Sequence, residues 1–411
     1  MKSIIKNIKI QCQSKSRALG KKGNYEFVKQ LKQYLEEHGV LYTAEEYKYK
    51  YFKTLEGSIT VDGIEYFSKT FVGAPPFFNY EYYGKYMLDR RGSFHISDAP
   101  DIYVEKLEQR DKLIENLESI LERKEIQAII FVIPGSTDNI LIDIVVSMSN
   151  PKANRIKNFR RIPIIAISEV TWNVIREAKV NRVEIKQKCV IDSATHENVI
   201  VNIGKGECQI YLCAHIDSAF EREDIEGAHD NASGVAIMMQ LVVELSKIKE
   251  LHKRVKFIFY NGEEYNMIGC FNLLIDMKKF NESHNYEDLF YMFHNGELKD
   301  YIILKAEEMV EFDVIGKGKV LHIFTNEDLH DMKELLQSIK TDEIEKVLLH
   351  NGGASLYYIL SKLDCNMKFH FSQLSNMINV IHTVNDNMEN IDEKDIRIYY
   401  NFIDNYIKKK L

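Results

Sequence analysis

Two stretches, QIYLCAHID at residues 209–217 and VKFIFYNGEE at residues 255–264, decide the fold class of this chain. Each is a short apolar run rich in β-branched and aromatic residues that ends in polar and charged residues, as buried strands do. Residues 233–250 between them carry the apolar pattern of a helix. Further strands are predicted at 199–203, 309–315 and 320–325. Strands that alternate with helices predict an α/β fold, and we expect a three-layer α/β/α sandwich around a mixed, mostly parallel sheet.

The pattern before residue 190 is less regular. Residues 24–38 repeat apolar side chains at helical spacing and precede Gly39, which predicts an amphipathic helix. Short strands are predicted at 127–133 and 162–167, and a helix is predicted over about 104–124.

The length of 411 residues favours more than one domain. We predict a catalytic domain made of residues 1–50 and 190–411, interrupted by a smaller β-containing insertion at 51–189.

Composition excludes several classes of function. Apolar residues make up 45% of the chain and charged residues 28%, which is the balance of a globular protein. The net charge is -7 and no basic block is interleaved with aromatics, so we predict no nucleic-acid partner. No apolar run is long enough to cross a bilayer, and the first twenty residues lack a secretory signal pattern. The six cysteines form no C-x-x-C pair, so we predict a reducing cytoplasm. Because no apolar run can span a bilayer, we also predict no membrane association.

Polar residues follow the strand at 209–217 and precede the next helix. His215 and Asp217 come at the carboxyl end of that strand, where alternation places them on one side and the carboxylate can orient the imidazole. The sequence GAHDNASG at 227–234 brings Asp230 just before the helix. Either Asn231 or Ser233 serves as the helix cap, which leaves the charge of Asp230 without a capping role.

Three further positions carry charge or an imidazole close to apolar runs. The adjacent carboxylates Glu263 and Glu264 follow a strand and repel each other unless a cation or a proton absorbs their charge. Asp313 lies in a strand-like run, where an unpaired charge is costly. His382 follows another apolar stretch, with Asp386 four residues on.

Each of these positions also has an ordinary structural explanation, such as a solvated turn or a satisfied polar residue. Taken together they supply two imidazoles and several carboxylates to one α/β region, and such mixed nitrogen and oxygen ligands suit zinc. A pair of zinc ions a few ångströms apart needs one carboxylate to bridge them. The combined pattern therefore favours a metal centre.

The order H-x-D-S, G-A-x-D-N-A-S-G, G-E-E, a strand Asp before Gly, and H-T-x-x-D resembles that of the co-catalytic di-zinc aminopeptidases. Their clan also contains glutamate carboxypeptidases and glutaminyl cyclases. The resemblance covers about 190–411, and the sequence RALGKKGNY at 17–25 is similar to the amino-terminal segment of that family. The stretch between the strands at 127–133 and 162–167 resembles a protease-associated domain.

The resemblance implies a role for each candidate residue. His215 and Asp313 would hold one zinc, Glu264 and His382 the other, and Asp230 would bridge them. Glu263 would be the general base. We count Asp217 with it as a catalytic residue, because its carboxylate can orient the imidazole of His215. The resemblance also implies a cis peptide between Asp230 and Asn231. The expected reaction is hydrolysis of the amino-terminal peptide bond of peptides.

Alternatives remain open at this point. A glutaminyl cyclase would use one zinc and an attacking amine, and a carboxypeptidase would recognise the other end of the substrate. A non-catalytic binding protein of the same fold is a further reading, although ligands and base are all retained. The tyrosines Tyr265, Tyr357 and Tyr358 either stabilise an oxyanion or serve as packing. The chain also departs from the family at Leu356, where an Asp usually follows the Ser.

Overall fold

The computed structural model covers residues 1–411. It describes the chain except for residues 15, 73–81, 107–116, 118, 139–143, 146–161, 207, 220–224, 266, 285–287, 290–291, 294, 304–307, 325–345, 351–355, 357–358, 361–368 and 373–379.

The chain divides into two compact units. Unit 1 comprises Met1–Tyr49, Ala194–Asn285 and Asn295–Leu411, and unit 2 comprises Lys50–Ser193 and Tyr286–His294. Two of the boundaries between them, at 49/50 and 193/194, fall within the long strands β1 (Thr43–Val61) and β9 (Val180–Ile203).

Unit 1 is built on a mixed sheet, which confirms the predicted α/β class. Its strand order is β14-β13-β15-β12-β10-β11-β9-β1. The central strands β12, β10 and β11 are parallel, whereas β9 is antiparallel to β11 and β13 is antiparallel to β15. Because parallel strands share one edge at their carboxyl ends, the residues that follow β10, β11 and β12 are brought together. The bounds are β10 Cys208–His215, β11 Arg254–Tyr260, β12 Glu308–Phe312, β13 Val320–Phe324, β14 Lys346–His350 and β15 Phe369–Ser372.

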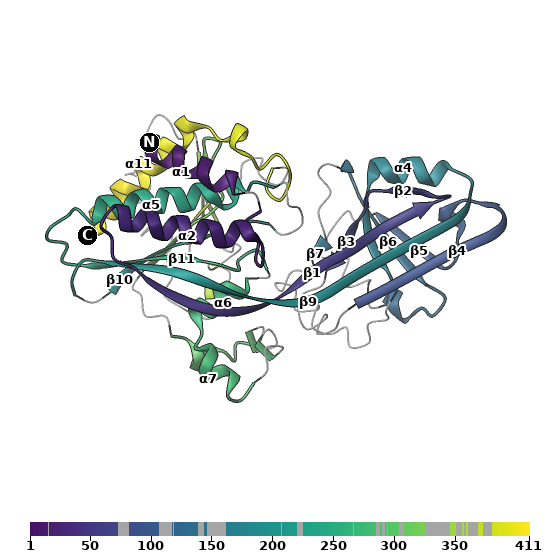
Figure 1. Ribbon diagram of the computed structural model, residues 1–411, viewed down its shortest axis with the longest axis horizontal. Coiled ribbons are helices and arrows are strands. Elements are labelled where there is room, and N and C mark those ends of the chain that lie inside the picture. The colour runs from purple at the N-terminus through teal and green to yellow at the C-terminus, as the bar shows by residue number, and fades with distance from the viewer. Residues whose placement is uncertain are drawn as a thin grey trace. The chain divides into compact units, whose positions relative to one another are not determined.

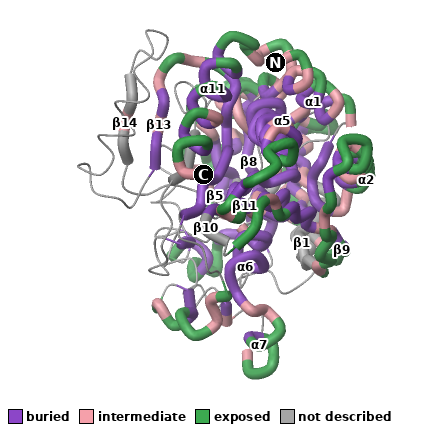
Figure 2. Tube along the Cα trace, turned by 90° about the vertical axis from the view of Figure 1, so that its left-hand side faces the viewer, coloured by how far each residue is buried: buried purple, intermediate pink, exposed green. Residues whose placement is uncertain are grey.

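Helices cover both faces of this sheet. On one face lie α1 (Lys2–Gln13), α2 (Lys22–Glu37), α5 (Ser233–Leu245) and α11 (Glu393–Lys410), and on the other lies α6 (Ile268–Leu274) (Figure 1). In α5 every residue except Gln240 and Glu244 is buried, so this helix runs through the core (Figure 2). The predicted helix at 24–38 corresponds to α2, and the one at 233–250 corresponds to α5.

Helices α1 and α11 of unit 1 are among those that were not predicted from the sequence. In α1 the fully buried apolar stripe is narrow, since Ile4, Ile8 and Cys12 form it and Ile5 packs beside it only partly buried. In α11 the side chain of Asp392 caps the first turn by accepting the N–H groups of Lys394 and Asp395. Both helices are fixed by packing against the core that α5 fills.

Unit 2 contains a separate five-stranded sheet in the order β5-β6-β8-β3-β7. Its strands β6 (Ala128–Ile133) and β8 (Ile164–Ser168) match the predicted strands, and the other bounds are β5 Ile102–Lys106, β3 Lys69–Val72 and β7 Ile144–Val145. The helix predicted from about 104 is wrong at its start, because residues 102–106 pair with β6 as a strand. Cross-strand pairing and burial on the sheet override helical propensity there.

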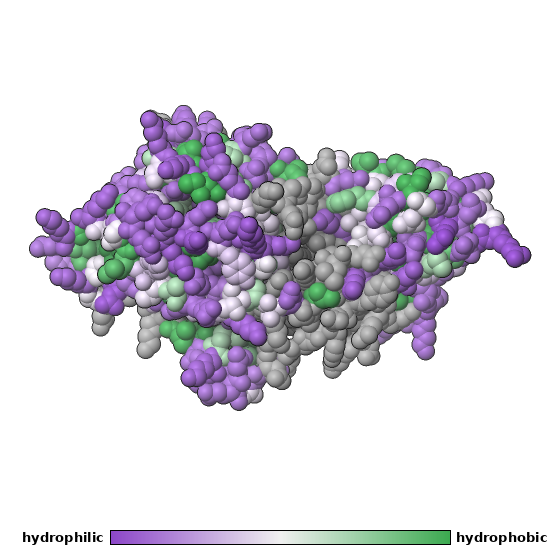
Figure 3. Space-filling view, in the orientation of Figure 1, coloured by the Kyte–Doolittle hydropathy of each residue, from purple (hydrophilic) through white to green (hydrophobic). Residues whose placement is uncertain are grey.

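The remaining elements of unit 2 are β2 (Ile64–Tyr66), β4 (Tyr82–Phe94) and α4 (Glu169–Glu177). Strand β4 pairs antiparallel with the first half of β9, and the hydroxyl of Ser168 caps α4 by accepting the N–H of Thr171. None of the helices described has the length and apolar composition needed to cross a membrane. Over unit 1 the face seen in Figure 3 is mainly hydrophilic, with small scattered apolar patches.

Candidate metal centre

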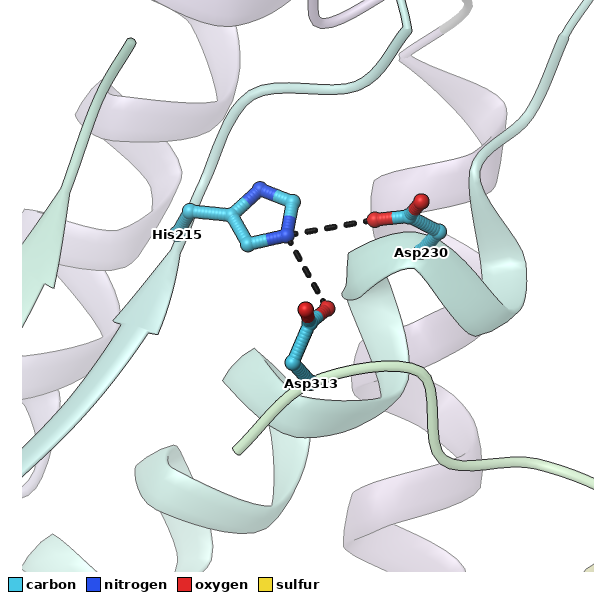
Figure 4. A group of neighbouring side chains, drawn as sticks. All are labelled: His215, Asp230 and Asp313. Atoms are coloured by element: carbon cyan, nitrogen blue, oxygen red, sulfur yellow. Dashed lines mark hydrogen bonds and ion pairs between the residues drawn. The ribbon is translucent and has the colours of Figure 1, made fainter. Parts of the chain in front are cut away.

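His215 is the last residue of β10 and is fully buried. Its Nε2 atom lies 3.1 Å from Asp230 Oδ1 and 3.1 Å from Asp313 Oδ1, so the imidazole faces two carboxylates (Figure 4). Asp313 directly follows β12, the parallel neighbour of β10. The shared sheet edge thus joins two residues that are 98 positions apart in the sequence.

Asp230 lies in the turn that leads into α5, and it is held from its backbone. The carboxylate of Asp386 accepts the N–H of His229 at 2.7 Å and that of Asp230 at 3.3 Å. The peptide bond between Asp230 and Asn231 is cis, as the sequence resemblance predicted. These contacts give Asp386 a defined task, which is to position the Asp230 backbone.

Two polar side chains at the start of α5 make different contacts. The side chain of Asn231 accepts the N–H of Gly234 at 3.2 Å and donates to the carbonyl of Phe312 at 2.6 Å. The hydroxyl of Ser233 instead donates to the carbonyl of His229. The N-cap position of α5 is Ala232, which has no capping side chain, so neither predicted residue stands there. Asn231 still accepts a backbone N–H of the first turn, and it ties the turn to the end of β12.

Asp217 holds the turn that carries the two glutamates. Its Oδ1 accepts the N–H groups of Gly262 at 2.9 Å and Glu263 at 3.3 Å, and its Oδ2 accepts that of Glu264 at 3.0 Å. His215 Nδ1 lies 3.7 Å from the Asp217 carboxylate, so the imidazole does not donate to that carboxylate at hydrogen-bond distance. It lies 3.1 Å from the backbone oxygen of Asp217. Three backbone donors occupy the carboxylate instead.

His382 lies in a turn within 380–386 and has a positive φ of 59°. Its Nε2 atom is 3.3 Å from Asp230 Oδ2 and 3.1 Å from Glu264 Oε2. The turn is held by Thr383, whose hydroxyl donates to the carbonyl of Val380 and accepts the N–H of Asn385. The two oxygens of Asp230 therefore face two different imidazoles.

The predicted residues form overlapping groups that could hold a metal ion. One group combines His215, Asp230 and Asp313, a second combines Asp230, Glu264 and His382, and in each the ligand atoms lie within 4.8 Å of one another. A third group contains His215, Glu263 and Glu264. The candidate ligands and catalytic residues lie together at one edge of the unit 1 sheet, and they are His215, Asp217, Asp230, Glu263, Glu264, Asp313 and His382.

The electrostatics of this cluster favour a bound cation. Burial, together with the charge of Asp230, raises the pKa of Glu264 to about 8, and burial also raises the pKa of Glu263 well above its ordinary value. Burial lowers the pKa of His215, but the carboxylates of Asp217, Asp230 and Asp313 raise it further than burial lowers it. So many buried carboxylates must take up protons or share a cation.

The donor set fits a divalent metal. Glu264 Oε1 is buried and has no hydrogen-bond partner among the residues that the structure describes. Two imidazole nitrogens with carboxylate oxygens form a ligand set that suits zinc. The residues present therefore fit a zinc site.

Comparison with known proteins agrees with this geometry. Residues 198–407, just over half of the chain, match the model of Peptidase family M28. This chain belongs to Peptidase family M28. The match spans the five candidate ligands and both glutamates of the turn after β11.

The M28 chain is also similar to individual proteins. A probable lipoprotein aminopeptidase, LpqL from Mycobacterium tuberculosis, is 27% identical over 114 residues, which cover 27% of this chain and 22% of that protein. A zinc aminopeptidase from Bacillus subtilis matches with a TM-score of 0.68 at 15% identity, over 100% of this chain and 95% of that one. An aminopeptidase from Aneurinibacillus sp. strain AM-1 matches with a TM-score of 0.59 at 14% identity, over 99% and 92%. The structural matches show a shared fold.

Sequence reasoning missed the function of Arg17 in this M28 site. Arg17 is fully buried, and its guanidinium donates to the carbonyl of Ile216, next to His215. Its only signal was the RALGKKGNY resemblance at 17–25. Of the tyrosines, Tyr265 is largely buried, whereas Tyr357 and Tyr358 lie outside the described residues. Leu356, where the chain departs from the family, is buried.

The contacts of Asp217 lead to a first prediction. Asp217→Asn replaces one carboxylate oxygen by an amide that repels the backbone N–H groups of residues 262–264, so the turn carrying Glu263 and Glu264 should shift. We expect peptidase kcat to fall about 10–100-fold, as changes behind metal ligands do. Asp62→Asn is the matched control, since Asp62 also accepts two backbone N–H groups but belongs to unit 2. Equal kcat in both variants would remove this role from Asp217.

Proposed function

We propose that the chain is a zinc-dependent aminopeptidase that hydrolyses the amino-terminal peptide bond of peptides. The observation that carries this proposal is the position of Asp230, whose Oδ1 faces His215 at 3.1 Å while Oδ2 faces His382 at 3.3 Å. A carboxylate shared in this way is what a two-metal centre requires. Membership of Peptidase family M28 supports the reaction class.

The proposed ligands divide into two sets. His215 and Asp313 would hold one ion, Glu264 and His382 would hold the other, and Asp230 would bridge both. When bound, the two ions would neutralise the carboxylates, polarise the scissile carbonyl and acidify an attacking water. The short contacts within each set support this division.

Glu263 is the proposed general base. It is only partly buried, whereas Glu264 is buried, and Asp217 fixes the backbone of both residues. A carboxylate that is not needed as a ligand can take a proton from the attacking water and deliver it to the amine that leaves. One carboxylate oxygen of Glu263 also lies within 4.8 Å of the ligand atoms of His215 and Glu264, so the proton would move next to the metals.

The location and the insertion belong to the same proposal. We propose that the chain works in a reducing compartment, and the buried, unbridged thiols of Cys12, Cys213 and Cys270 support this. We also propose that unit 2 resembles a protease-associated domain, on the basis of its short apolar strands alone.

The direct test compares peptides of one sequence that differ only at their ends. A peptide with a free amino terminus should lose its first residue, whereas the amino-terminally acetylated form should resist, because an aminopeptidase must bind the free amine. A peptide amidated at the carboxyl terminus should be cleaved at the normal rate. Mass spectrometry of the products checks all three results. Cleavage of the acetylated peptide from its carboxyl end would instead identify a carboxypeptidase, and loss of ammonia from an amino-terminal Gln would identify a cyclase.

A further inference from the structure

In the amino-terminal segment from Ser16 to Asn24, residues 16–19 and residues 23–24 are buried in unit 1. We infer that Arg17 and Asn24 in this segment are positioning residues that brace the two halves of the centre against each other. The inference rests on the proposed function, since it concerns the same site. Neither residue contacts a candidate ligand side chain in the hydrogen bonds that the structure describes. Arg17 binds backbone carbonyls, and Asn24 binds the carbonyl of Arg17 and the side chain of Asn261.

Arg17 braces the half that carries His215 and Asp230. Its guanidinium is 0% exposed and donates four hydrogen bonds, all to backbone carbonyls. The acceptors are Ile216 at 3.1 Å, Gln11 at 3.3 Å, Glu226 at 2.7 Å and Gly227 at 2.9 Å. Ile216 follows His215, and Gly227 opens the turn to Asp230. One side chain therefore ties the backbone at Ile216 to the backbone at Glu226 and Gly227.

The fit between Arg17 and this turn is close. A Cβ atom on Gly227 would lie 2.9 Å from Arg17 Nη2 and 2.5 Å from the carbonyl oxygen of Asp230. Gly227 has a φ of 61°, a conformation that glycine adopts at little cost. The guanidinium and the Asp230 turn thus pack without spare room, and a shift of Arg17 must be transmitted to the turn.

Asn24 braces the half that carries Glu263 and Glu264. Its Nδ2 donates to the side-chain oxygen of Asn261 at 2.6 Å and to the carbonyl of Arg17 at 2.6 Å. Asn261 directly precedes the turn, and its own amide donates to the carbonyl of Glu197 on β9. Asn24 and Asn261 are both 0% exposed, so these bonds are made away from water.

His196 completes the arrangement by fixing the orientation of Asn24. The N–H of Gly20 donates to His196 Nε2 at 2.9 Å, so the proton lies on Nδ1, which donates to Asn24 Oδ1 at 2.9 Å. The ring of His196 also stacks on Tyr25, with centroids 4.6 Å apart. Every polar atom of the Asn24 side chain therefore has a partner, and the amide has one orientation.

The consequence is that one short segment connects the loop after β10 with the turn after β11. The first supplies His215 and Asp230, and the second supplies Glu263 and Glu264. A metal centre requires its ligands to be held within about 0.5 Å by supporting contacts. Arg17 and Asn24 should therefore affect zinc affinity and kcat, although they are not proposed to touch the substrate.

The test uses Arg17→Lys and Asn24→Ser in the full-length zinc-loaded protein. Lysine keeps the charge but cannot reach four carbonyls, and serine keeps a polar group but cannot span to Asn261 and Arg17 together. Lys22→Ala is the control, because Lys22 lies in the same region with its side chain 88% exposed. Zinc affinity is measured by competition with a chelator, and kcat and KM are measured on one peptide.

We expect the apparent zinc dissociation constant to rise about 10–100-fold in both variants, with kcat falling and KM changing less. Lys22→Ala should match the unmodified protein. A zinc dissociation constant equal to that of Lys22→Ala in either folded variant would overturn the inference, even where the unfolding temperature of the zinc-free protein has dropped. Zinc affinity can be measured without turnover. A protein that binds zinc but cleaves no peptide would contradict the proposed function, while the zinc affinities of the variants would still test the role of Arg17 and Asn24.

Discussion

Replacing Glu263 by glutamine should lower kcat by about 10²–10⁴-fold while zinc remains bound. Glutamine fills nearly the same volume but cannot accept a proton from water. The backbone of residue 263 stays fixed by the carboxylate of Asp217, so the ligand Glu264 should keep its place. The measurement is kcat on a peptide with a free amino terminus, together with the zinc content of the same preparation.

Glu250→Gln provides the matched control for this experiment. Glu250 is an exposed glutamate of unit 1, and the same chemical change there should leave kcat and zinc content unaltered. If Glu263→Gln keeps full turnover with full zinc, Glu263 is not the base and the proton must pass through another group. If zinc is lost as well, Glu263 is a ligand.

Replacing Asp230 by asparagine should remove most of the activity through the metal itself. The amide presents only one oxygen, so it can face His215 or His382 but cannot bridge the two ligand sets. We expect the zinc content to fall below two ions per chain and kcat to fall by about 10³-fold or more, because several kcal/mol of charge stabilisation is lost. Elemental analysis of dialysed protein measures the first result and peptide kinetics the second.

Asp392→Asn tests whether such an effect is specific to Asp230. Asp392 accepts the N–H groups of Lys394 and Asp395 at the start of α11, and asparagine caps helices about as well, so this variant should change neither the stability nor the zinc content much. An active Asp230→Asn variant with two zinc ions would exclude a bridging role. A fully active unmodified protein with a single zinc would favour the one-metal arrangement of a cyclase.

The sequence predicted the main strands of both sheets. The candidate site lies at the carboxyl edge of the unit 1 sheet. Continuous apolar runs such as residues 209–214 and 255–260 are unambiguous, because each is short, β-branched or aromatic, and ends in polar residues. Helices α1 and α11 were missed for a physical reason. Their stripes are narrow or mixed with Lys and Asn, so they are stable only against the core that α5 and the sheet provide.

The candidate ligands could be named from the sequence because an unpaired charge next to a buried strand is costly and so indicates a partner such as a metal ion. His215, Asp230, Glu264 and His382 each belong to a motif, and even Asp313, which had only a strand and a following glycine as support, lies beside His215. Their number and chemistry predicted zinc. The family match over 198–407 bears out the recognition of the family, and the individual roles stay predictions.

The tertiary structure alone decided what surrounds those residues. Asp217 was expected to orient His215, yet its carboxylate holds the turn at 262–264, which β11 brings next to β10. Arg17 and Asn24 gave no sign of their contacts, because their partners are backbone carbonyls and an amide some 200 residues away. A motif records the side chain that the chemistry needs. The groups that hold it depend on which chain segments pack together, and a sequence pattern carries no distance between such segments.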